Sequence, residues 1–362
     1  MPGRIERALA QGDLDAARNL VSQLLAVPQL SADTLLGTGV ALTEHDMYPE
    51  AARVFERCVQ DFPQRFEGYY NLALAELTLG KNTEALTTIE KAPRATPAEE
   101  VARTYLRGKT EVALGKNAEA ERDLNAAFAA APQEENYALD LGLYYLRVQK
   151  YQESLAVFQK ATRVRKDSPY LELGLGLAQF MGGKNEESID TCRALLTAQH
   201  DFSPARVLLA FALYMQGRIE EAEKTADEGL RDPNPFAYLY YLHAVTLIKL
   251  GSKDYDLMLN DLTAAARAIP QCSLCYLAMS KVHERQGERA IATSDLEKTV
   301  SFDPGFAEAW YRLATLYDQA GQTDAARQAR QRFALLKEKK ADRETEVLRD
   351  VFLKVLGGTG SP

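Results

Sequence analysis

The chain has 362 residues, of which 46% are hydrophobic and 26% are charged, a balance typical of a folded protein and not of a disordered chain or a collagen-like fibre. Its 43 Lys and Arg against 51 Asp and Glu give a net charge of −8, which repels nucleic-acid phosphates and argues against a nucleic-acid partner. No stretch approaches the roughly 18 consecutive apolar residues that a membrane span requires, so none is expected.

The first residues lead into a short helix-like segment that contains Glu6 and Asp13 and lacks the apolar core of a signal peptide. On this sequence a cytoplasmic location is expected, and a periplasmic or extracellular one would follow if a leader had been removed. Because only a shortened helix precedes Gly12, residues 1–31 are predicted to form an N-terminal half-repeat or cap.

A turn position then recurs every 34 to 36 residues along the chain. These positions are Gly12, Asp46, Gly80, Gly115, Gln149, Gly183, Gly217, Gly251, Gly287 and Gly321. A small residue stands seven positions before nearly every turn and another stands five positions after it, with Met258 as the exception. Two small sites per repeat predict two closely packed helices, so each unit is read as a helical hairpin with a left-handed residue at the turn.

This pattern resembles the tetratricopeptide-repeat family over about residues 1 to 336. The best match runs from Ala307 through Trp310 and Ala314 to Gly321 and Ala326. The resemblance implies an all-α, right-handed superhelical solenoid of antiparallel helix pairs, with nine repeats over residues 32–336. It also implies that first helices line a concave face, and that the protein is a non-enzymatic scaffold for protein–protein interaction.

The concave face can be read from the sequence, because residues 10, 6 and 3 positions before each turn share one stripe of the first helix. In the middle repeats this stripe and its flanks are apolar or aromatic, and they are predicted to form a partner-binding groove. The residues are Leu139, Leu143, Leu146, Tyr170, Leu173, Leu177, Phe180, Met181, Val207, Phe211, Tyr214, Met215, Tyr238, Tyr241, Val245 and Ile248. The alternative is that some of these side chains pack against the next repeat.

Cys272 and Cys275 form the only motif with candidate chemistry, a single CxxC at the start of a predicted first helix. The pair is predicted either to serve packing or a structural disulfide, or to act as a redox dithiol whose thiolate the helix dipole favours. No other catalytic motif is recognised. We therefore expect no catalytic residues, no cofactor and no metal.

Residues 337–356 are predicted to form a C-terminal amphipathic capping or docking helix, followed by a disordered tail at 357–362. Val347, Leu348, Val351, Phe352 and Val355 lie on one stripe of that helix, and this stripe must bury against something. It could cap the last repeat, or stay exposed to bind a partner or to oligomerise.

These features favour a scaffold that binds a protein or peptide partner, as an extended segment or a helix, in the apolar groove. Two alternatives remain open. One is a structural protein whose solenoids self-associate end to end, and the other is a thiol redox protein that uses the CxxC pair.

Overall fold

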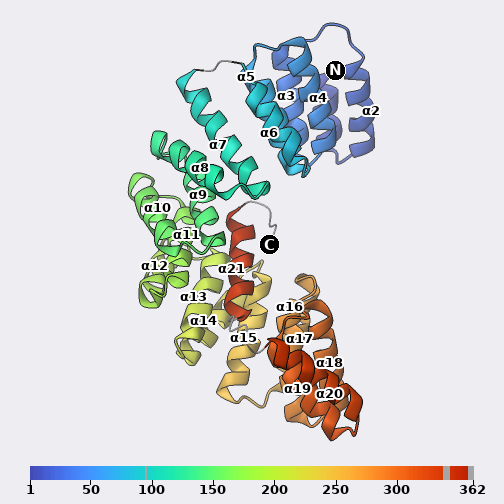
Figure 1. Ribbon diagram of the computed structural model, residues 1–362, viewed down its shortest axis with the longest axis vertical. Coiled ribbons are helices and arrows are strands. Elements are labelled where there is room, and N and C mark those ends of the chain that lie inside the picture. Colours follow the sequence, from blue (N-terminus) through green and yellow to red (C-terminus); the bar gives the residue numbers. More distant parts are fainter. Residues whose placement is uncertain (94–95, 337–342, 358–362) are drawn as a thin grey trace. The chain divides into compact units, whose positions relative to one another are not determined.

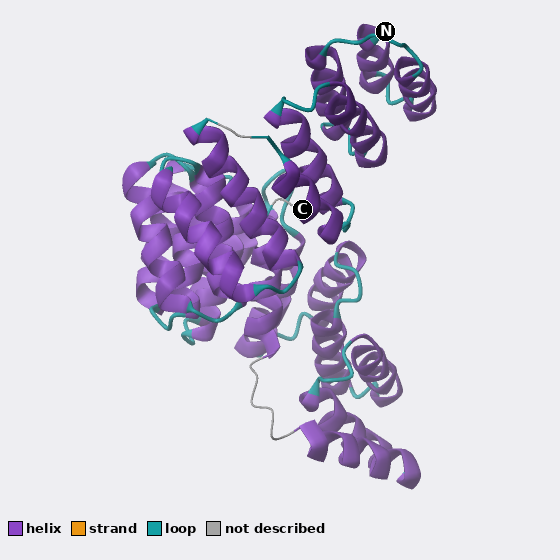
Figure 2. Ribbon diagram, turned by 45° about the horizontal axis from the view of Figure 1, so that its top comes forward, coloured by secondary structure: helices purple, strands orange, loops and turns teal. Residues whose placement is uncertain are grey.

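The computed structural model describes residues 1–93, 96–336 and 343–357, and within these ranges the chain folds into helices and turns without a strand (Figures 1 and 2). The chain divides into two compact units, residues 1–144 and 145–362. The all-α fold class predicted from the sequence is confirmed.

The first unit consists of successive helix pairs. Its helices are α1 (Pro2–Ala10), α2 (Leu14–Leu25), α3 (Ala32–Thr43), α4 (Tyr48–Asp61), α5 (Phe66–Thr78), α6 (Asn82–Lys91), α7 (Pro97–Ala113), α8 (Asn117–Ala130) and most of α9 (Glu135–Arg147). The segment expected to be a half-repeat, residues 1–31, contains a pair, α1 and α2, whose first helix is short.

The second unit begins within α9 and continues the same alternation of first and second helices. Its helices are α10 (Tyr151–Val164), α11 (Pro169–Met181), α12 (Asn185–Ala198), α13 (Ser203–Met215), α14 (Ile219–Leu230), α15 (Ala237–Leu250), α16 (Tyr255–Ala268), α17 (Ser273–Gln286), α18 (Arg289–Phe302), α19 (Ala307–Gln319), α20 (Thr323–Leu336) and α21 (Arg343–Leu356). Helices α3 to α20 make up nine pairs over residues 32–336.

Two predicted C-terminal segments fall partly outside the described residues. The predicted C-terminal helix began at residue 337, but residues 337–342 lie outside the described part, and the described helix α21 begins at Arg343. Of the predicted tail, only Gly357 is described.

The turns follow the sequence register closely. All ten predicted turn positions have a positive φ, between 57° and 82°, including the two that are not glycine, Asp46 and Gln149. At Gly80, the following Lys81 N–H donates to the Glu76 carbonyl at 2.9 Å, which closes the helix end, and the same bond recurs after other turns. The 34-residue period is therefore a period of left-handed helix ends.

A left-handed glutamine is strained, because its Cβ crowds the backbone in that conformation. Replacing Gln149 (φ 61°) by Gly is expected to raise the free energy of unfolding by up to about 1 kcal/mol. Gln216 is the matched control, since it ends α13 with a φ of −81°, and Gln216→Gly should instead destabilise. Denaturant unfolding of both variants tests this, and a loss of stability in Gln149→Gly would contradict it.

The small residues of the repeat mark where helices touch. The nine small residues that stand five positions after a turn are fully buried, and so is Met258, which replaces the tenth. Seven positions before Asp46, Gly39 of α3 lies so close to Phe55 of α4 that an added Cβ would overlap the phenyl ring. Close helix approach at these sites buries the core of each pair.

Candidate partner-binding groove

The predicted groove residues come from first helices in both units. Leu139 and Leu143 lie on the part of α9 that belongs to the first unit, while Leu146 and all later members belong to the second. In the second unit the set follows α11, α13 and α15, whose neighbouring first helices contact one another. We use "groove" below for the surface of these three helices and the start of α17.

Most of the side chains predicted from the sequence to form the groove are buried. Leu139, Leu143, Leu146, Leu173, Leu177, Phe180, Val207, Phe211, Tyr241, Val245 and Ile248 are all in this class. Met181, Tyr214 and Tyr238 are half-buried. Tyr170 and Met215 are exposed, at 43% and 38% of their surface.

Packing between successive repeats accounts for part of this burial. The rings of Phe180 in α11 and Phe211 in α13 meet edge to face with centroids 5.5 Å apart, and Tyr214 lies 6.4 Å beyond Phe211. Such aromatic pairs stabilise by about 0.5–1.5 kcal/mol beyond their area of burial. The aromatic side chains thus form a continuous surface across the two helices.

Helix α21 lies on the groove and covers part of it. Figure 1 shows α21, in red, beside α13 and α15, and the helix also packs against α11. Its Leu348, Phe352 and Leu356 are buried, and Phe352 has no exposed surface. A small cavity at this contact is lined by Phe211, Tyr238, Tyr241, Leu242 and Leu274 from the groove and by Glu344, Val347 and Leu348 from α21. The C-terminal helix therefore docks on the first helices of the middle repeats.

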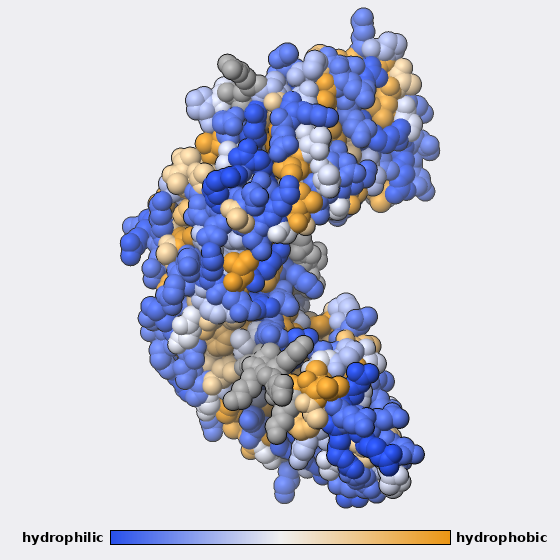
Figure 3. Space-filling model, viewed as in Figure 1, coloured by the Kyte–Doolittle hydropathy of each residue, from blue (hydrophilic) through white to orange (hydrophobic). Residues whose placement is uncertain are grey.

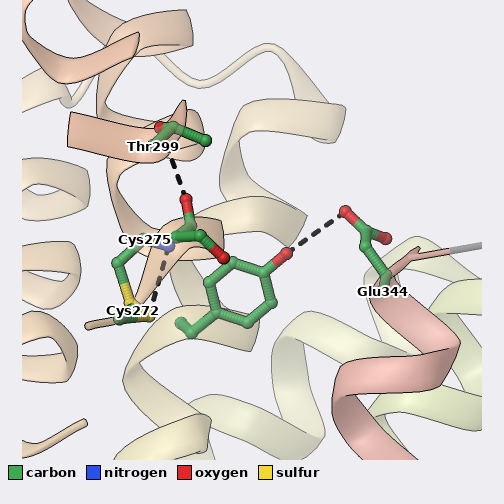
Figure 4. The surroundings of a disulfide bond; sticks show 6 residues. Cys272, Cys275, Thr299 and Glu344 are labelled. Carbon is green, nitrogen blue, oxygen red and sulfur yellow. Dashed lines mark hydrogen bonds between the residues drawn. A yellow bond between two sulfur atoms is a disulfide. The ribbon is translucent and has the colours of Figure 1, made fainter. Parts of the chain in front are cut away.

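Polar contacts fix the N-terminal end of α21. The Tyr241 hydroxyl donates to Glu344 Oε1 at 3.2 Å (Figure 4), and Arg343 Nε donates to Asp303 Oδ2, after α18, at 2.7 Å. Burial, together with the Glu344 carboxylate, raises the pKa of Tyr241 well above its usual value, so the hydroxyl stays protonated as a donor.

Further along α21, Arg349 lies between a residue of its own helix and one of α10. The Arg349 guanidinium donates from Nε to Asp350 Oδ1 at 3.1 Å, and it lies near the hydroxyl of Tyr151, the first residue of α10. Burial and the nearby Asp350 raise the pKa of Tyr238 to about 12. The start and the middle of α21 thus have polar contacts with other helices of the second unit.

Cys272 and Cys275 form a disulfide in the first turn of α17 (Figure 4). Cys272 is the N-cap of the helix, and its Sγ accepts the Cys275 backbone N–H at 3.2 Å. Both residues are buried, and Leu274 between them faces the cavity beneath α21. The other cysteines, Cys58 and Cys192, are free and buried, and burial raises the pKa of the Cys192 thiol to about 12.

Two histidines pair with aspartates between the helices of a repeat. His243 Nδ1 lies 2.6 Å from Asp261 Oδ2, and His283 Nδ1 lies 2.7 Å from Asp295 Oδ2. Although burial lowers the pKa of His243, the hydrogen bond and charge of Asp261 raise it more, to a net value above the usual one. Across residues 1–93, 96–336 and 343–357, no three His, Cys, Asp or Glu side chains are grouped so as to hold a metal ion.

The surface of the protein is mostly hydrophilic on the face that Figure 3 shows. On the face that Figure 3 shows, apolar residues occur in small groups among hydrophilic ones. None of the described helices combines the length and the apolar character that crossing a membrane requires.

Repeated helix pairs with a groove on their first helices define a helical-repeat protein. Family models described as tetratricopeptide repeat match residues 4–65, 44–100, 139–204, 209–228 and 296–328, which together make up more than half of the chain. The chain belongs to the tetratricopeptide-repeat family, which confirms the resemblance seen in its sequence. Repeats of this family indicate a scaffold for protein–protein interaction, and hence protein partners.

Two solved structures are similar to this chain. A tetratricopeptide repeat protein from Parabacteroides merdae is 17% identical, with a TM-score of 0.52 over 69% of this chain and 98% of that one. The C-terminal part of a TPR repeat-containing protein from Cytophaga hutchinsonii is 15% identical, with a TM-score of 0.46 over 76% of this chain and 97% of that one. The first likeness supports the fold. No curated protein matches this chain in sequence.

Proposed function

We propose that the protein is a non-enzymatic scaffold that binds an apolar helix of a partner protein in the groove of α11, α13, α15 and the start of α17. One observation carries the proposal. An amphipathic helix of this chain, α21, lies in the groove with Leu348, Phe352 and Leu356 buried.

The groove has the properties of a helix receptor. It presents aromatic side chains on rigid helices, which is the surface on which amphipathic helices dock by apolar residues three and four positions apart. Tyr241 adds a buried hydroxyl that can select a carboxylate on the incoming helix. Met181 and Met215 at its margin are flexible enough to adapt to different apolar side chains.

The disulfide is well suited to a structural role in this scaffold. Cys272 and Cys275 are buried, and they hold the turn that places Leu274 beneath α21. A buried disulfide with one sulfur capping a helix suits support of the groove better than exchange with other thiols.

The test is the affinity for a partner identified by capture from the native source. Phe211→Ala with Tyr241→Ala is expected to weaken binding by about 30-fold or more, because aromatic anchors in a desolvated groove commonly contribute 2 kcal/mol or more. The comparison is made in a Phe352→Asp background. In the wild-type chain the same substitutions would also loosen α21. Release of α21 raises the affinity for the partner and would offset the affinity lost with the aromatic side chains.

Two controls separate binding from stability. Leu257→Ala with Ile291→Ala alters exposed side chains on the second helices α16 and α18 and should leave affinity unchanged. Leu209→Ala, in the core of α13, should lower stability and spare affinity. If the folded groove variant keeps full affinity, the partner binds elsewhere.

A further inference from the structure

We infer that the partner's helix has the same recognition pattern as α21, and that α21 and the partner compete for one site. The inference rests on the proposed function, which it makes specific. The pattern consists of three apolar residues spaced four apart, preceded by a carboxylate four positions before the first. In α21 these are Leu348, Phe352 and Leu356, with Glu344 as the carboxylate.

The burial along α21 defines the apolar part of this pattern. Leu348, Phe352 and Leu356 are almost fully covered, while Asp350 and Lys354 on the opposite side are exposed. A spacing of four places the three buried residues on one stripe of a helix. A partner helix needs the same stripe to cover the same groove.

The hydrogen bond between Tyr241 and Glu344 defines the polar part. The Tyr241 ring is buried, so its hydroxyl needs an acceptor whenever the groove is occupied. Glu344 supplies that acceptor at 3.2 Å, and its distance from Leu348 along the helix sets the register. A partner helix without an acceptor at this position leaves the hydroxyl buried and unsatisfied, and a carboxylate is the strongest acceptor that a side chain can offer.

Direction is set by contacts at different places on the second unit. Arg343 pairs with Asp303 near the end of α18, and Arg349 reaches Tyr151 at the start of α10. The N-terminal part of α21 therefore lies toward α15 and α17, and the later part lies toward α10 and α11. We assign the same direction to the partner helix.

α21 can leave the groove without dismantling the repeats. Helices α1 to α20 pack in successive pairs, so the interfaces within the array do not require α21. Covalent linkage keeps α21 near the groove at an effective concentration of about 1 mM. For a free helix with a Kd of about 10 μM, the occupied form then exceeds the open form about 100-fold, and partner affinity falls by the same factor.

The experiment uses a fluorescein-labelled synthetic peptide of residues 343–356 and the full-length chain. Phe352→Asp in the chain places a carboxylate where the phenyl ring is buried, which should release α21 and leave the groove intact. We expect the wild-type peptide to bind the Phe352→Asp chain about 100-fold more tightly than it binds the wild-type chain, by fluorescence anisotropy. A peptide carrying Phe352→Asp is the matched control and should bind neither chain.

The polar part of the pattern is tested with the same assay. A peptide carrying Glu344→Gln should bind the released chain about 10-fold less tightly than the wild-type peptide, because the amide is a weaker acceptor than the carboxylate. Tyr241→Phe in the released chain should remove that difference. Equal binding of the two peptides to the released chain would refute the carboxylate requirement.

Should Phe352→Asp fail to fold by circular dichroism, Leu348→Ala with Phe352→Ala replaces it, since this variant introduces no charge. Equal peptide binding by wild-type and released chains, or binding by neither, overturns the inference. So does a wild-type dimer, by light scattering, that the Phe352→Asp substitution converts to monomer, because α21 would then occupy the groove of a second copy. The proposed function is judged separately, by the affinity of the groove variant for the captured partner.

Discussion

Replacing Phe158 by Ala is expected to lower the free energy of unfolding by about 3–5 kcal/mol, the range for a fully buried phenylalanine. Phe158 lies in α10 with no exposed surface, and its ring packs directly on Gly174 of α11. Gly174 has no side chain that could move into the space that the ring leaves. The cavity should therefore persist, and the cost should fall toward the upper end of the range.

Gly174 allows the same contact to be tested from its other side. A Cβ added at Gly174 would overlap the Phe158 ring, so Gly174→Ala alone should destabilise by about 1–3 kcal/mol. In the Phe158→Ala background the Cβ enters vacant space, and Ala should then stabilise by up to about 1 kcal/mol, as in other helix interiors.

Denaturant unfolding of the four chains completes a double-mutant cycle. The expected result is a reversal of sign for Gly174→Ala between the two backgrounds. If its effect were the same in both, Phe158 and Gly174 would not share the contact that the structure shows.

The repeat could be predicted from the sequence because its signals are local and recur in register. Each turn needs a left-handed residue, and each helix pair needs small residues at fixed offsets, so ten weak signals support one another. The spacing alone predicts turns at Asp46 and Gln149, which are not glycine, and both have a positive φ. Gly174 lies outside that register, nine residues before Gly183, and its close approach to Phe158 was not predicted.

The docking of α21 could not be predicted, because it depends on contacts between distant residues. Tyr241 and Glu344 are separated by 103 positions, and no periodic signal relates them. The stripe that contains Leu348 and Phe352 shows only that some surface must cover it, and the apolar groove shows the same need. The only sign in the sequence that α21 covers the groove is that the chain contains two apolar surfaces without a known partner. The sequence equally allows the helix to cap the last repeat or to remain exposed.

Because α21 occupies the groove, the burial of the bulky groove residues has two sources. From sequence, the bulky stripe residues had two explanations, packing against the next repeat and binding of a partner. The contact of Phe180 with Phe211 supports the first, and the cover of Phe211 and Tyr241 by α21 supports the second. The same side chains thus join neighbouring repeats and present a surface to a helix.

Replacing Phe352 by Ala is expected to lower the hydrogen-exchange protection of α21 by about 100-fold, to the level of an undocked helix. Phe352 is the most deeply buried residue of the helix, and its truncation removes about 3–5 kcal/mol, enough to offset a docking equilibrium of about 100. Helices α1 to α20 should keep their protection, because neighbouring repeats stabilise one another without α21.

Val355→Ala is the control, since Val355 is a neighbouring half-buried residue on the same helix, and its truncation should lower protection by less than about 10-fold. Exchange is followed by mass spectrometry on peptides from α21 and from α13. A loss of protection in α13 as large as that in α21 would mean that α21 is part of the array's core and not a separable occupant of the groove. Unchanged protection of α21 in Phe352→Ala would mean that the stripe of Leu348, Phe352 and Leu356 does not hold the helix in place.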